Sequence, residues 1–94
     1  MSLSKNNIID KATIRGGLYL YSFSDAIDLI TYCNDNNLSI LGIDAFIISK
    51  DKTQPVSEHS VDYSASQQKG NWDRAITFIQ SKSSLNHMYE VIYS

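Results

Sequence analysis

Residues 39–49 read SILGIDAFIIS, and this stretch decides which fold class the sequence predicts. Four of its eleven residues are isoleucine, and the polar segments Asn36-Asn37 and Lys50–Lys52 bound it on both sides. A short run rich in β-branched residues favours a strand. Apolar residues fall on both alternating sets, so we expect a central strand covered on both faces, as in a parallel sheet.

Two segments with helical periodicity flank this strand. The first is expected over Asp25–Asn36, because Ser24 is a good N-cap and Asn36-Asn37 suits a helix end. The second begins at Asn71 and ends near residues 81–84. In each, the apolar residues recur at three- and four-residue spacing: Ala26, Ile27, Ile30 and Cys33 in the first, and Trp72, Ala75, Ile76 and Ile79 in the second.

The rest of the chain is less regular. Leu18–Tyr21 is a brief strand candidate after the Gly16-Gly17 turn, and Met88–Tyr93 is a closing strand. Residues 50–66 indicate a surface loop with a short edge strand, and residues 1–11 a frayed lead-in. The sequence therefore predicts a single small α/β domain over residues 1–94. Its order is β-α-β-(β)-α-β, with a three- to four-stranded, mostly parallel sheet packed against two helices.

Composition narrows the function classes. Eight basic and ten acidic residues give a net charge of −2, and there is no basic block of the kind that nucleic-acid binding needs. No apolar run approaches the roughly 20 residues of a membrane span, and the polar N-terminus lacks the apolar core of a signal peptide. Cys33 is the only cysteine, so no internal disulfide can form. We expect a soluble cytoplasmic protein that binds neither nucleic acid nor membranes.

The case for catalysis is thin. Cys33 lies on the apolar stripe of the first helix, where a buried structural thiol is expected. Neither His59 nor His87 has a neighbour at metal-ligand spacing, so both are interpreted as solvated surface histidines. No glycine-rich phosphate loop occurs. The prediction is a non-enzymatic protein without catalytic residues, cofactor or metal.

Interaction with another protein has better support. Six tyrosines and one tryptophan are a high count of residues that anchor interfaces. Trp72 and Tyr32 are expected in the core, whereas Tyr63 and one of Tyr89 and Tyr93 are expected to be exposed. An acidic rim that carries tyrosine suits a basic protein partner. The predicted contact surface, chosen from charge and expected exposure, consists of Asp44, Glu58, Asp62, Tyr63 and Asp73.

Three stretches in this order also resemble a known class of proteins. They are residues 26–30 (AIDLI) running into 38–46 (LSILGIDAF), residues 71–79 (NWDRAITFI), and the closing residues 89–92 (YEVI). Together they resemble small immunity proteins of bacterial polymorphic-toxin and contact-dependent inhibition systems. The resemblance implies that the protein binds one cognate toxin with a basic surface in a stoichiometric complex. This binding would block the active or essential site of the toxin. The alternative is a small regulatory or homo-oligomeric module, for example a homodimer paired through a sheet edge; a small enzyme ranks third.

Overall fold

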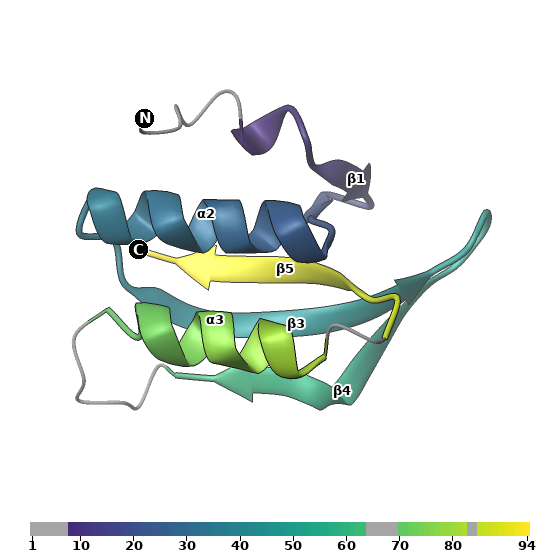
Figure 1. The fold of residues 1–94 in the computed structure, drawn as a ribbon. Helices are drawn as coiled ribbons and strands as arrows, with labels where there is room; N and C mark the ends of the chain where they lie inside the picture. The colour runs from purple at the N-terminus through teal and green to yellow at the C-terminus, as the bar shows by residue number, and fades with distance from the viewer. Residues whose placement is uncertain (1–7, 64–69, 83–84) are drawn as a thin grey trace.

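The main sheet is antiparallel and has the strand order β4-β3-β5. The computed structural model describes residues 8–63, 70–82 and 85–94. The isoleucine-rich stretch forms the central strand β3 (Ile40–Ile48), as predicted, and lies between β4 (Thr53–Asp62) and β5 (Met88–Tyr93) (Figure 1).

A small hairpin extends this sheet on the β5 side. It consists of β1 (Thr13–Arg15) and β2 (Leu18–Leu20), joined by the predicted glycine turn with positive φ angles of 54° and 85°. Tyr21, directly after β2, exchanges two main-chain hydrogen bonds of 2.8 Å with Tyr89. The hairpin therefore continues the sheet next to β5.

The prediction of a mostly parallel sheet is wrong. β3 ends at Ile48 and β4 begins at Thr53, and so short a link can only reverse the chain direction. Residues 50–66, read as a loop with a short edge strand, thus contain a strand of ten residues. Each helix does connect two parallel strands, but a third strand lies between them: β5 separates β2 from β3, and β3 separates β4 from β5. These are split β-α-β units.

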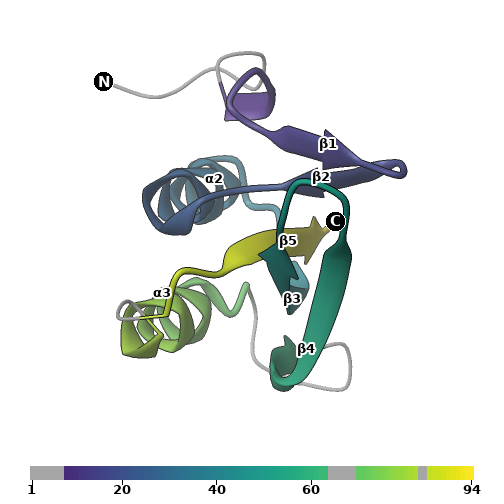
Figure 2. The ribbon, with the colours of Figure 1, turned by 90° about the vertical axis from the view of Figure 1, so that its right-hand side faces the viewer.

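Both helices lie on the same face of the sheet (Figure 2). They are α2 (Phe23–Asp35) and α3 (Trp72–Ser81). Their buried residues pack with the inward residues of the strands: Ala26, Leu29, Ile30, Cys33, Ala75 and Ile79 against Ile43, Ala45, Tyr89 and Val91. The expectation that β3 is covered on both faces therefore holds for helices on one face only, and the second face of the sheet is left to other elements.

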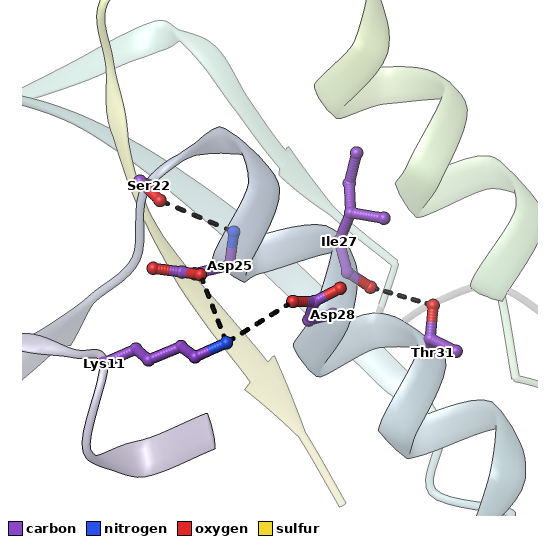
Figure 3. A network of polar contacts seen from close by, with 6 residues as sticks. All are labelled: Lys11, Ser22, Asp25, Ile27, Asp28 and Thr31. Atoms are coloured by element: carbon purple, nitrogen blue, oxygen red, sulfur yellow. Dashed lines mark hydrogen bonds and ion pairs between the residues drawn. The ribbon is translucent and has the colours of Figure 1, made fainter. Parts of the chain in front are cut away.

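The start of α2 contacts the short turn formed by residues 8–11 (Figure 3). Ser22, not Ser24, is the N-cap, and its hydroxyl oxygen accepts a hydrogen bond from the Asp25 N–H at 3.4 Å. The Lys11 Nζ lies 3.9 Å from an Asp25 carboxylate oxygen and 3.8 Å from one of Asp28. Ile8 is 2% exposed and belongs to the core. The predicted frayed lead-in therefore does not extend to residues 8–11, and residues 1–7 lie outside the described residues.

One end of the second face is sheltered by the two hairpins. The Arg15 guanidinium donates a hydrogen bond of 2.9 Å to the carbonyl of Ser49, at the tip of the β3–β4 hairpin. Leu20 and Phe46 are buried, although neither belongs to the helix-side core. The two described helices, α2 and α3, both lie on the opposite face, so neither covers the rest of this face (Figure 2).

Candidate functional site

The uncovered part of the second face gathers acidic side chains. Asp44 on β3 stands directly opposite Glu90 on β5, and Gly42 stands opposite Ile92 on β5 and Asp62 on β4. These positions alternate with Ile43 and Ala45, which point into the helix-side core. We call Asp44, Asp62, Glu90 and Ile92, grouped around Gly42, the acidic face.

Asp44 and Glu90 form a pair of carboxyl groups. Like charges directly opposite each other on neighbouring strands are unfavourable. Partial burial, the charge of Asp44 and a hydrogen bond to Asp44 together raise the pKa of Glu90 above its usual value. The pair therefore binds a proton more readily than two separate acids would, and a cationic group could replace that proton.

A recess lies beside this pair, above Gly42. It has a volume of about 320 Å³ and is lined by Leu41, Gly42, Asp44, Val61, Asp62 and Ile92. A Cβ atom on Gly42 would approach the Val61 carbonyl oxygen to 3.1 Å, so a side chain here would be tightly placed. Ile92 is 41% exposed and forms an apolar wall. The recess suits a lysine or arginine side chain, whose stem packs on apolar groups while its head meets carboxylates.

The structure brings two of the five predicted contact residues together on this face, Asp44 and Asp62. Glu58 is exposed in an irregular part of β4. Tyr63 was expected to be exposed, but it is 5% exposed and packs in the core, with the Arg74 guanidinium carbon 4.8 Å from its ring centre. Tyr63 and Asp73 instead line a separate groove of about 480 Å³ between β4 and α3. The five residues therefore do not form one surface.

Glu90 is the residue that sequence reasoning missed. The alternation in residues 88–93 separates Met88, Glu90 and Ile92 from Tyr89, Val91 and Tyr93, and this signal was readable. The sequence did not reveal that β5 lies beside β3, nor that helices leave this face open. Only the strand register places Glu90 opposite Asp44.

The other aromatic and thiol predictions have mixed outcomes. Cys33 is buried as predicted, and burial raises the pKa of its thiol to about 11, so it stays protonated at neutral pH. Trp72 packs against the core, and its indole N–H donates to the Leu38 carbonyl at 2.7 Å. Tyr89 is fully buried and Tyr93 partly buried, so the expectation that one of them is exposed is wrong.

The two histidines are not separate solvated side chains. The His59 Nδ1 lies 2.8 Å from the His87 Nε2, so that prediction is also wrong. In the described part of the chain, no three His, Cys, Asp or Glu side chains cluster as a metal site would require. Within the same residues, neither helix is long and apolar enough to cross a membrane.

Replacing Glu90 by glutamine tests the carboxyl pair directly. Because the pKa of Glu90 is raised in the folded protein, ionising it is unfavourable there at neutral pH. Glu90→Gln is expected to increase the free energy of unfolding at pH 7 by about 0.5–1 kcal/mol. The gain should decrease as the pH falls through about 4.5, because the unfolded chain then also binds the proton. Urea denaturation at pH 7 and pH 4 measures it, with Glu58→Gln as the exposed control; an equal gain at both pH values would contradict the assignment.

Comparison with protein-family models and with curated proteins gave no match.

Proposed function

We propose that this is a cytoplasmic, immunity-type protein that neutralises a cognate toxin by binding it through the acidic face. The single observation that carries the proposal is the Asp44–Glu90 pair on the uncovered face of the sheet. Two acids held opposite each other destabilise the free protein, and a cation from a partner would relieve that cost. The sequence resemblance to immunity proteins is consistent with the same role.

The physical mechanism is occlusion guided by charge. A lysine or arginine from the partner would place its aliphatic stem against Ile92 and its cationic head between Asp44 and Asp62. Complementary charge speeds the encounter and orients the two proteins. Toxin domains that act on nucleic acid carry basic active-site surfaces, and such a surface covered by this face could no longer reach its substrate.

Self-association through a sheet edge ranks second because both edges are poorly suited to pairing. β4, at one edge, contains Pro55 and a register shift opposite Ile43 and Ala45. β1, at the other edge, has three residues. Prolines, bulges and short edge strands are features that discourage edge-to-edge pairing.

Co-expression with the toxin-like protein encoded next to this one tests the proposal. The wild-type protein should restore growth and co-purify with its partner. The double variant Asp44→Lys/Glu90→Lys should fail to restore growth and should bind at least about 100-fold more weakly, because it places like charges across the interface. Titration calorimetry with the purified partner measures the affinity.

The matched control is Asp35→Lys/Asp73→Lys, which changes the net charge equally but on exposed positions of the two helices. It should bind within a fewfold of wild type. Loss of binding in the helix variant, with the sheet variant unaffected, would move the interface to the helix layer. A neighbouring protein that is neither toxic nor bound would remove the immunity proposal.

A further inference from the structure

The two histidines meet at an irregularity in β4. Ile43 pairs with Val61 and Ala45 pairs with Val56, so residues 57–60 of β4 stand opposite Asp44 alone. We call residues 57–60 the β4 bulge. The Ser60 hydroxyl links the two ends of the bulge to the regular strands. It accepts a hydrogen bond from the Ala45 N–H and donates one to the Val56 carbonyl, both at 3.0 Å. His59 projects from this bulge.

His87 reaches the same place from the opposite side of β3. It lies directly before β5. Its ring packs edge-on against the Tyr89 ring, with 6.4 Å between the two ring centres. β4 and β5 are separated by β3, so the contact between His59 and His87 must span the central strand. The pair therefore joins the two outer strands of the main sheet at a point where the regular β3–β4 pairing is interrupted.

The geometry of the pair fits a shared proton better than a metal ion. The facing nitrogens are 2.8 Å apart and the ring centres 5.0 Å apart, so the two nitrogens point almost straight at each other. A metal on that line would need the nitrogens about 4 Å apart, twice the usual bond length of roughly 2.0–2.1 Å. A separation of 2.8 Å is that of an N–H···N hydrogen bond. One ring donates and the other accepts, so at least one ring must be neutral.

Burial and a nearby cation oppose a second positive charge on the pair. Lys82, at the end of α3, is the charged group that acts on His87, and Tyr89 is the titratable group that contacts it from β5. Among the described residues, neither histidine forms an ion pair with an acidic side chain. Protonating both rings would set two cations against each other, with Lys82 nearby.

We propose that His59 and His87 form a pH-sensitive clasp that holds the β4 bulge against the start of β5 and releases it when both rings are protonated. The hydrogen bond exists while one ring is neutral and becomes a repulsion once neither is. The Ser60 hydroxyl bonds do not titrate in this range, so release should affect the bulge without unfolding the sheet. Glu58 lies in the bulge, so acidification changes the position of an exposed acid.

The direction of the pH dependence follows from His87. Burial, then the neighbouring His59, then Lys82 lower the pKa of His87 below its ordinary value near 6.5. The unfolded or released chain therefore takes up the proton first as the pH falls. The stability contributed by the clasp is fully present above about pH 6.5 and is lost progressively below it.

Hydrogen–deuterium exchange of the full chain at pH 7.5 and pH 5.0, corrected for intrinsic rates, tests the clasp. Exchange of the bulge amides relative to β3 should be faster at pH 5.0 than at pH 7.5, because the released chain binds more protons than the closed one. The His87 ring, followed by NMR, should titrate at a lower pH than an exposed histidine, and replacing His59 should move that titration.

Three variants complete the test. His59→Gln and His87→Gln should each abolish the pH dependence of bulge exchange. His59→Gln should also raise the pKa of His87 part of the way, because burial and Lys82 still hold it below its ordinary value. Glu58→Gln, in the same bulge, should leave both readouts as in wild type. A His87 titration that does not change when His59 is replaced would overturn the proposal, and so would bulge exchange that does not change with pH. Saturable Ni²⁺ binding that depends on both histidines and leaves bulge exchange insensitive to pH would replace the clasp with a metal site.

Discussion

Replacing Tyr89 by alanine is expected to lower the free energy of unfolding by about 3–5 kcal/mol, the range for truncating a buried aromatic side chain. Tyr89 is fully buried and belongs to the helix-side core. It also sits where the sheet is joined: it pairs with Ala45 on β3 and exchanges two hydrogen bonds with Tyr21. A cavity here would loosen the packing of both strands on the helices. Denaturant unfolding followed by circular dichroism measures the loss.

Tyr89→Phe is the matched control because it keeps the ring and removes the hydroxyl. Within the described residues, the buried Tyr89 hydroxyl has no hydrogen-bond partner. Removing an unsatisfied buried polar group should be neutral or stabilise by about 1 kcal/mol. A loss above about 1 kcal/mol in the phenylalanine variant would mean that the hydroxyl is satisfied, and a small loss in the alanine variant would contradict the packing role.

Replacing Gly70 by alanine is expected to cost about 2–4 kcal/mol, because strained backbone and a steric clash add. Gly70 has φ +82°, and a Cβ there would lie 2.5 Å from ring atoms of Trp72. The ring cannot move away freely, since its N–H is bonded to the Leu38 carbonyl. The Gly70 carbonyl itself accepts a 2.8 Å hydrogen bond from the Ile40 N–H. The substitution should therefore separate the start of α3 from the start of β3.

Gly17→Ala separates the two contributions. Gly17 has φ +85°, close to that of Gly70, but a Cβ there would meet nothing within 4 Å. Its cost should be about 1–2 kcal/mol, the backbone cost alone. Thermal and denaturant unfolding of both variants gives the difference, which we assign to the clash with Trp72. Equal losses in the two variants would show that the ring moves aside.

Secondary structure was largely readable along the chain. The apolar spacing in residues 26–33 placed a helix that the structure shows as Phe23–Asp35, and the isoleucine run placed the central strand almost to the residue. Asn37 adopts the left-handed conformation expected after the helix, with φ 57°. The predicted helix N-caps were less accurate. The N-cap of α2 is Ser22 and not Ser24. The Asn71 side chain donates a hydrogen bond to the Ile40 carbonyl instead of capping its own helix.

Tertiary structure decided the sheet direction and the site. Local sequence around β3 is apolar on both alternating sets, which suggested a strand covered on both faces in a parallel sheet. The sheet is antiparallel, and the cover over Phe46 comes from the hairpins. Asp44 stood out in the sequence as a charged residue inside an apolar strand. Its partner Glu90 lies 46 residues later in the chain, and only the register of β5 places it opposite Asp44. His59 and His87 are likewise brought together across β3.

The sequence by itself determined where the two helices, the central strand and the closing strand form, because that depends on side-chain spacing within a few residues. It did not reveal the full length of β4. It also determined that Cys33 is buried and that the chain carries more acid than base. Which strands are neighbours, which face stays open and which acids stand opposite each other depend on contacts between distant segments. Those contacts are set by how several elements bury their apolar faces together, and no local pattern records that result.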